Sequence, residues 1–155
     1  MRRLIAVVGA SVCSPEEADR AETVGRLLAA HQAVLLCGGY GGVMEAAARG
    51  AQQAGGLTVG ILAGRDRAEA NAYIDVALAT GMGEMRNALL VRAAEAVIAI
   101  GGGWGTLSEI ALAQRMGTPV VGLHDTFPAV AELARVTTPA HAVTWALEHA
   151  AGNTV

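Results

Sequence analysis

Two residues of this sequence, Arg86 and Glu109, have types and surroundings suited to chemistry on an anionic ligand. Glu109 follows the apolar run AVIAI and a turn that is rich in glycine, with Gly101, Gly102, Gly103 and Gly105. Glycine lets backbone N–H groups approach a ligand closely, and a helix that begins at such a turn adds the positive end of its dipole. The segment therefore predicts an anion-binding turn with a carboxylate just behind it.

Glu109 itself has two possible roles. Thr106 and Glu109 have the T-x-x-E spacing of a capping box, in which the carboxylate folds back onto the Thr106 backbone N–H and does no chemistry. Alternatively, the carboxylate lies in the first turn of a helix whose N-terminus faces the ligand, and it reaches a ribose or a water. We favour this second role, because Arg86 and a second glycine loop precede the turn.

Arg86 stands at the expected start of the preceding helix, just after Gly81 and Gly83. From there its forked guanidinium can project into the same cleft and bind a phosphate. Two structural alternatives remain open, namely an exposed arginine on the helix surface and a buried ion pair with Glu109.

Four loops are expected at the edge of the sheet where ligands bind in open parallel sheets, and they span residues 9–15, 38–42, 80–87 and 101–106. Neither glycine loop matches GxGxxG, so NAD is not the first choice of ligand. Trp104 could stack on a ring of the ligand or pack at a dimer contact. The residues predicted to bind the phosphate or the rest of the ligand are Gly9, Ser11, Gly38, Gly39, Gly41, Gly42, Asn87, Gly102, Gly103, Trp104, Gly105 and Thr106.

Composition excludes several kinds of site. All 11 basic residues are arginine, so neither a Schiff-base lysine for pyridoxal phosphate nor a Walker-type phosphate lysine is present. The two cysteines, Cys13 and Cys37, have no paired spacing, which argues against zinc and against a disulfide framework. We therefore expect no metal and no cofactor.

Charge and hydropathy limit the kinds of partner that we expect for this protein. The net charge is −3 and no basic run occurs, so we expect no nucleic-acid partner. The apolar runs are far shorter than the roughly 20 residues of a membrane-spanning helix, so we expect no membrane partner. We interpret the segment MRRLIAVVGAS as a first strand rather than a signal peptide, and we expect a cytoplasmic protein.

The elements that must position these residues alternate between strands and helices. Apolar runs typical of buried parallel strands occupy residues 4–9, 33–39, 57–62, 74–79, 96–102 and 119–123. Helices are predicted from Pro15 to about Ala30, capped by Ser14, and over about 42–54, 85–94, 106–116 and 139–150. Residues 124–137 could hold a short helix or a final strand.

This alternation predicts an α/β fold, a Rossmann-like domain with a doubly wound, mostly parallel sheet of six or seven strands. We expect residues 1–155 to form one such domain. The Ala-rich helices over 42–54 and 106–116 are nearly apolar on several faces, which suggests that they are buried at a subunit interface as well as on the sheet. We therefore expect a homodimer.

The segment RNALLVRAAEAVIAIGGGWGTLSEIALA resembles the signature of the Lonely Guy family of cytokinin-activating nucleoside 5′-monophosphate phosphoribohydrolases, PGGxGTxxE preceded by an arginine at a helix start. CGGYGGVMEAAARGA is similar to the family's earlier loop, GGGxxGLM. The resemblance spans about residues 4–123. It implies a Rossmann-like, usually dimeric protein in which Arg86 and Glu109 are catalytic and Gly102, Gly103, Gly105 and Thr106 form the phosphate-binding turn.

Two departures point to a particular branch. The family's proline is replaced by Gly101, and the lysine after its arginine is replaced by Asn87. Both substitutions resemble the branch of molybdenum-cofactor carrier proteins and related bacterial homologues.

The resemblance implies two possible functions. One is hydrolysis of the N-glycosidic bond of a nucleoside 5′-monophosphate to free base and ribose 5-phosphate. The other is a non-catalytic carrier or sensor for a nucleotide or a pterin phosphate.

Overall fold

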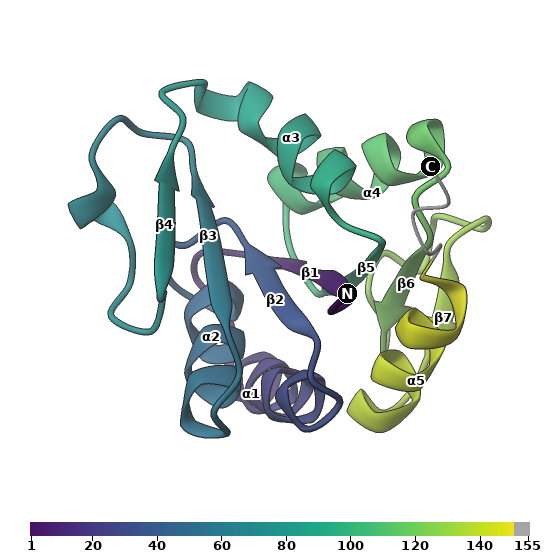
Figure 1. Ribbon diagram of the computed structural model, residues 1–155. Coiled ribbons are helices and arrows are strands. Elements are labelled where there is room, and N and C mark those ends of the chain that lie inside the picture. The colour runs from purple at the N-terminus through teal and green to yellow at the C-terminus, as the bar shows by residue number, and fades with distance from the viewer. Residues whose placement is uncertain (151–155) are drawn as a thin grey trace.

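A computed structural model of the protein describes residues 1–150, in which seven strands form a single sheet. The order across the sheet is β4-β3-β2-β1-β5-β6-β7, and each neighbouring pair is parallel (Figure 1). This confirms the predicted Rossmann-like α/β fold. The strands are β1 (Leu4–Gly9), β2 (Val34–Cys37), β3 (Thr58–Leu62), β4 (Val76–Ala79), β5 (Ala96–Ile100), β6 (Val120–Leu123) and β7 (Ala134–Val136).

The strand order reverses between β1 and β5. The chain builds outward from β1 to β4, then returns to the centre and builds β5 to β7 in the other direction. In open parallel sheets such a reversal leaves a crevice beyond the C-terminal ends of the two central strands, because the loops that follow them diverge. The topology therefore places the loop after Gly9 beside the loop after Ile100, in agreement with the register in which these two residues pair.

Helices cover both faces of the sheet (Figure 1). Helices α1 (Pro15–Ala30), α2 (Val43–Gln53) and α5 (Pro139–His149) pack on one face, and α3 (Arg86–Ala93) and α4 (Trp104–Met116) pack on the other. Two short 3₁₀ turns, η1 (Arg67–Glu69) and η2 (Gly83–Met85), precede β4 and α3. No helix within residues 1–150 is long and apolar enough to cross a bilayer.

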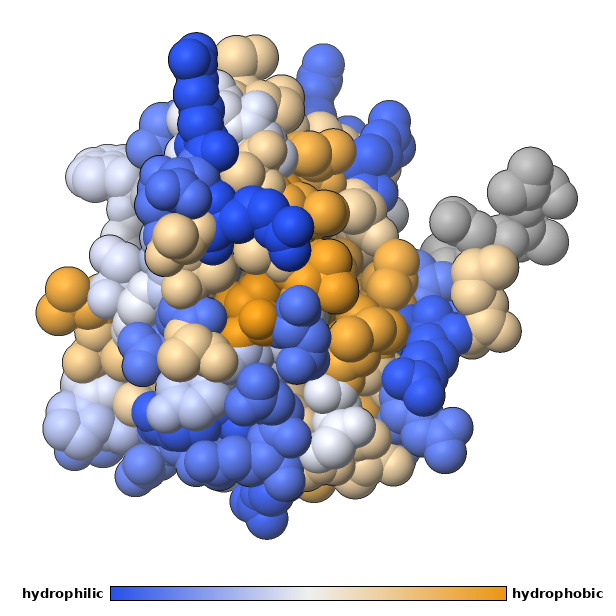
Figure 2. Space-filling model, turned by 60° about the vertical axis from the view of Figure 1, so that its left-hand side comes forward, coloured by the Kyte–Doolittle hydropathy of each residue, from blue (hydrophilic) through white to orange (hydrophobic). Residues whose placement is uncertain are grey.

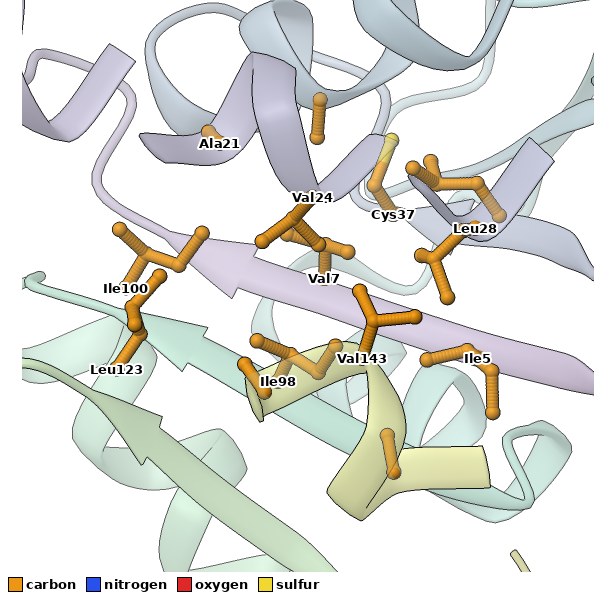
Figure 3. Packing of buried hydrophobic residues seen from close by; sticks show 14 of the residues in the cluster. Ile5, Val7, Ala21, Val24, Leu28, Cys37, Ile98, Ile100, Leu123 and Val143 are labelled. Atoms are coloured by element: carbon orange, nitrogen blue, oxygen red, sulfur yellow. The ribbon is translucent and has the colours of Figure 1, made fainter. Parts of the chain in front are cut away.

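The core consists of two layers of aliphatic side chains. Under α1, α2 and α5, Val7 and Ile98 from the central strands meet Val24, Leu28 and Val143, all fully or almost fully buried (Figure 3). The layer under α3 and α4 is built in the same way from small and branched residues. With so few aromatic residues, such a core depends on close approach of the backbones.

The crossing of α1 and α2 shows this close approach. A Cβ at Gly25 would collide with the carbonyl of Ala47, and a Cβ at Gly50 would collide with the carbonyl of Glu22. The Arg49 guanidinium binds the Glu22 carboxylate across the same crossing, with 2.6 Å between Nη2 and Oε2. The small, apolar composition of α2 is thus explained by packing inside the subunit, and it needs no subunit interface.

The observed start of α1 agrees with its prediction, whereas the observed start of α4 differs from its prediction. Ser14 caps α1 in a full capping box with Glu17, as predicted. Helix α4, by contrast, begins at Trp104, two residues before the predicted start, with Gly103 at the N-cap. Thr106 therefore lies inside the helix, so the predicted helix start is wrong, and the capping box, the less favoured alternative for Glu109, does not form.

Two other segments differ from, or complete, the predictions. The ambiguous stretch 124–137 contains the short edge strand β7, one of its two predicted alternatives. The run 74–79 was expected to be covered on both faces, but it forms the edge strand β4, in which Val76 and Leu78 are exposed. These side chains share a face with Val59 and Ile61 of β3, the face on which α3 lies.

Candidate functional site

A cavity of about 410 Å³ lies at the C-terminal edge of the sheet, at the strand-order reversal. Its volume is in the usual range of small-molecule sites. Loops after β1 and β2, the turn before α3 and the first turns of α4 form its wall. The residues predicted from the sequence that line it are Gly9, Ser11, Gly38, Arg86, Asn87, Gly103, Gly105, Thr106 and Glu109.

Arg86 and Glu109 come together in this cavity. Arg86 Nη1 lies 3.9 Å from Glu109 Oε1, and the two side chains are only 10% and 9% exposed. This separation is too long for a hydrogen bond. Arg86 Nε and Nη1 are buried without any hydrogen-bond partner in the described part of the chain. A buried guanidinium with unsatisfied donors is costly to a protein, so its position points to an anionic ligand that completes it.

Burial also changes the acidity of Glu109. Loss of hydration raises the pKa of this carboxyl from 4.5 to about 7, against the lowering effect of the nearby Arg86 cation, while the Glu84 carboxylate adds to the rise. A carboxyl with such a pKa can exchange a proton near neutral pH, which is the property required of a general acid or base.

The glycine turn presents backbone donors to the cavity. Helix α4 begins at its edge, and among residues 1–150 no side chain caps the N-terminal N–H groups of this helix. Positions 103 and 105, which line the cavity, have open space where a Cβ would stand. Free N–H groups and the positive end of the helix dipole therefore point to a site for an anion, next to the Arg86 cation.

Gly101 explains why this turn lacks the proline of the Lonely Guy signature. Its φ is +54°, a value that proline cannot adopt, and its N–H donates to Thr126 Oγ1 at 2.8 Å. A Cβ at this position would also collide with the Glu17 carboxylate. Thr126, 2% exposed, donates a hydrogen bond from its hydroxyl to the Leu123 carbonyl and so connects the turn to the end of β6. No sequence signal marks Thr126.

Asn87, where the Lonely Guy family has lysine, joins the two helices at the cavity. Its Nδ2 donates to Ser108 Oγ at 3.0 Å, and Ser108 Oγ donates to the Gly105 carbonyl at 2.6 Å. The side chain of Asn87 is therefore used to hold the start of α3 against the start of α4.

The remaining predicted ligand-binding residues do not line the cavity. The backbone of Gly39 faces Leu62 of β3, and its carbonyl accepts hydrogen bonds from Asn71. Gly41 and Gly42 lie against the loop after β1, where they lead the chain into α2. Gly102 packs on Thr106, and the Trp104 side chain is 87% exposed to solvent. These positions shape the loops around the cavity rather than its wall.

Six residues of the wall were not predicted from the sequence: Val8, Ala10, Tyr40, Met44, Ala63 and Glu84. For two of these residues the sequence carries a signal, because they stand next to predicted site residues. Tyr40 stands between the glycines of the second loop, and Glu84 is two positions before Arg86. Ala63 follows β3 directly, so a strict search of all residues at the ends of strands would have found it.

Neither cysteine has the lowered pKa that is typical of a nucleophilic thiol. Burial raises the pKa of the Cys37 thiol to about 12, and the Gly39 N–H donates to its sulfur at 3.3 Å. Burial and the Glu17 carboxylate also raise the pKa of Cys13. Among the described residues, no group of three or more His, Cys, Asp or Glu side chains is arranged to hold a metal ion.

Comparison with known proteins places this geometry in a family. An uncharacterised protein of Archaeoglobus fulgidus is 44% identical over 144 residues, which cover 92% of this chain and 93% of that protein. The molybdenum cofactor binding protein of Rippkaea orientalis is 34% identical, with a TM-score of 0.85 over 93% of this chain and 94% of its own. The molybdenum cofactor carrier protein of Chlamydomonas reinhardtii is 29% identical, with a TM-score of 0.87 over 96% and 98%.

The carrier proteins suggested by the sequence thus occur among the similar solved structures. The match to a family covers the sheet, the helices on both of its faces and the loops of the cavity, and it does not assign the chain to that branch. Residues 2–148 match the SLOG cluster4 family, and the chain belongs to that family.

Proposed function

We propose that the cavity binds a phosphorylated, nucleotide-type ligand, with the phosphate on Arg86 and on the N-terminus of α4. The observation that carries this proposal is the buried guanidinium of Arg86, whose Nε and Nη1 have no partner in residues 1–150 while they lie beside an uncapped helix start. A phosphate supplies the oxygens that these donors lack. Ser11, Gly38 and Thr106 complete the wall around the ligand.

The reaction that this arrangement supports best is hydrolysis of the N-glycosidic bond of a nucleoside 5′-monophosphate. The bond between the base nitrogen and the anomeric carbon breaks, water adds its oxygen to that carbon, and its proton goes to the base. Glu109 stabilises the positive charge that develops on the sugar and orients the water. Arg86 holds the phosphate so that the anomeric carbon stays near the carboxylate. A pKa of about 7 lets Glu109 accept the proton of the water and release it again, so that this proton ends on the departing base.

A carrier role is the second candidate, and the names of the similar structures favour it. Two proteins that are 34% and 29% identical to this chain are described as binding or carrying the molybdenum cofactor, which is a pterin phosphate. In this role the pterin phosphate is a cargo, Arg86 binds its phosphate, and Glu109 accepts a hydrogen bond from it. The chain would then belong to the branch that the substitutions at 87 and 101 resemble.

One experiment separates the two functions. The protein is incubated with a panel of nucleoside 5′-monophosphates while ribose 5-phosphate is measured, together with the Glu109→Gln variant as the matched control. Hydrolysis that disappears in Glu109→Gln supports the enzyme. If no monophosphate is turned over, the enzyme is excluded, and binding of molybdenum cofactor by the wild-type protein supports the carrier. If neither ligand class binds, the proposed function is wrong.

We further propose that the protein is a homodimer in the cytoplasm. Figure 2 shows apolar residues gathered on one face of the molecule between hydrophilic ones. On the face of the sheet that α3 covers, the exposed apolar side chains include Val76 and Leu78 of β4, Met85 directly before α3, and Leu89 of α3. A second copy of the chain would bury them, since isologous contacts pair a patch with itself. We propose one domain, and neither a nucleic acid, a membrane, a metal nor a cofactor as a partner.

A further inference from the structure

The Arg86 side chain is held in the cavity with very little hydrogen bonding from the rest of the chain. Its Nε and Nη1 have no partner in residues 1–150, and the nearest carboxylate oxygen, Glu109 Oε1, is 3.9 Å from Nη1. Arginine has high rotamer entropy, so contacts other than hydrogen bonds must fix this guanidinium.

The loop after β2 supplies these contacts. Arg86 Cζ lies 5.9 Å from the centroid of the Tyr40 ring, over its face, which is within the range of a cation–π interaction. On the same loop, a Cβ at Gly38 would stand 2.6 Å from Arg86 Nη1, so only glycine leaves room for the guanidinium. Gly38 and Tyr40 therefore both lie next to the guanidinium.

The Tyr40 ring is itself fixed at both ends. Its hydroxyl accepts hydrogen bonds from the backbone N–H groups of Ala63 and Gly64, at 3.0 Å and 3.1 Å, and donates to Glu69 Oε2 at 3.2 Å. Its backbone carbonyl accepts a hydrogen bond from Asn71 Nδ2 at 2.8 Å. The ring is therefore a rigid platform, fastened to the loop after β3 and to the segment before β4.

We propose that Tyr40 is a positioning residue for Arg86: the fixed ring holds the guanidinium by its face, so that the N–H donors of Arg86 remain available for the ligand. This inference rests on the proposed function, in which Arg86 binds the phosphate. A site built in this way is organised before the ligand arrives, and no internal hydrogen bond has to break on binding.

The proposal assigns different roles to the aromatic ring and to the hydroxyl of Tyr40. The aromatic face contacts the guanidinium, whereas the hydroxyl only anchors the ring. Tyr40→Phe keeps the face and Tyr40→Leu removes it. Tyr73 provides a matched control, because Arg49 Cζ lies 5.8 Å from the centroid of its ring and neither residue lines the cavity.

The first measurement needs no ligand. In protein with isotope-labelled arginine, the Nε–H resonance of Arg86 is assigned by its loss in Arg86→Lys. We expect wild type, Tyr40→Phe and Tyr73→Leu to show a ring-shifted, ordered Arg86 resonance, and Tyr40→Leu to move it to the position of a mobile arginine. An unchanged Arg86 resonance in Tyr40→Leu overturns the proposal. If Tyr40→Leu does not fold, Tyr40→Met takes its place.

The second measurement is the affinity for adenosine 5′-monophosphate and for ribose 5-phosphate by calorimetry. We expect Tyr40→Leu to bind roughly three- to tenfold more weakly, the usual range of a partly desolvated cation–π contact. Tyr40→Phe, which keeps the ring but loses the hydroxyl that anchors it, should lie between wild type and Tyr40→Leu, and Tyr73→Leu should stay within about twofold of wild type. Equal losses in Tyr40→Phe and Tyr40→Leu would overturn the role of the ring. Failure of the wild type to bind either phosphate would count against the nucleotide form of the proposed function, while the Arg86 resonance still decides the role of Tyr40.

Discussion

Arg86 Nη1 and Glu109 Oε1 face each other at 3.9 Å in a cavity where about nine-tenths of each side chain is buried. At this distance the two groups influence each other through their charges without sharing a hydrogen bond. Neither is fully satisfied by the other, since Arg86 keeps unpartnered donors among the described residues and Glu109 has an acidity far from that of a solvated carboxyl. This arrangement supports the proposal that a ligand binds between or beside the two groups.

The raised pKa of Glu109 predicts how stability depends on pH. Between pH 4.5 and about 7 the unfolded chain loses the Glu109 proton while the folded protein keeps it, so the free energy of unfolding falls as the pH rises through this window. The shift corresponds to roughly 3 kcal/mol at about 1.36 kcal/mol per pKa unit. We expect Glu109→Gln to gain up to that amount relative to wild type between about pH 4.5 and 8, measured by urea unfolding. Parallel pH profiles of the two proteins would contradict the buried, protonated carboxyl.

Arg86→Met tests whether the guanidinium is kept for a ligand rather than for the fold. The variant removes a buried cation with unsatisfied donors, so at about pH 5, where Glu109 is protonated in the fold, we expect the free energy of unfolding to be unchanged or higher. Affinity for a nucleoside 5′-monophosphate should fall at least about tenfold, since charged hydrogen bonds to the phosphate are lost. Arg86→Lys keeps the charge without the forked guanidinium, so its affinity should lie between those of wild type and Arg86→Met. A loss of stability at pH 5 with unchanged ligand affinity would assign Arg86 to the fold.

Much of the fold could be predicted because the signals were local. Runs of Val, Ile, Leu and Ala identified the six longer strands, and Ser14 with Glu17 identified the start of α1. The sequence does not distinguish a short helix from a strand at β7, because its three residues, Ala134–Val136, carry no apolar run and lie at the edge of the sheet.

As with the fold, the site residues that carry a local sequence signal were predicted, and those that depend on tertiary contacts were not. Arg86, Glu109 and the glycine turns were found from residue type and spacing, and all border one cavity or its loops. The T-x-x-E spacing at Thr106 was misleading, because a glycine N-cap at 103 starts α4 earlier and the spacing alone cannot reveal it. Thr126 and the platform role of Tyr40 depend on contacts between residues more than 20 positions apart, which only the fold brings together.

The exposed apolar face predicts where two copies meet. If β4 and α3 form the interface, Leu78→Glu places a charge in it, and we expect light scattering after size exclusion to change from the mass of a dimer to that of a monomer. Leu57→Glu is the comparison variant, since this exposed leucine directly precedes β3, at the end of that strand opposite to Ile61, the residue that pairs with Leu78. A dimer that survives Leu78→Glu would place the interface elsewhere, and a monomeric wild type would refute the homodimer.

The glycine at the start of the anion-binding turn makes the sharpest test of how this chain differs from the Lonely Guy signature. Gly101→Pro introduces the residue of that signature into a backbone with a φ of +54° and removes the N–H that donates to Thr126. We expect the free energy of unfolding to fall by about 3 kcal/mol or more, because proline can neither adopt this φ nor donate. Ligand affinity should fall as well, since the turn leads directly to the N-terminus of α4.

Thr126 supplies the control for this turn. Thr126→Ser keeps the hydroxyl that accepts from Gly101 and donates to Leu123, whereas Thr126→Val keeps the shape and leaves the Gly101 N–H without its acceptor. We expect Thr126→Val to lose about 1–3 kcal/mol of stability and Thr126→Ser to lose less, both measured by urea unfolding. If Gly101→Pro and Thr126→Val both unfold like wild type, the turn does not need the left-handed glycine, and the departure from the signature would have no structural cause.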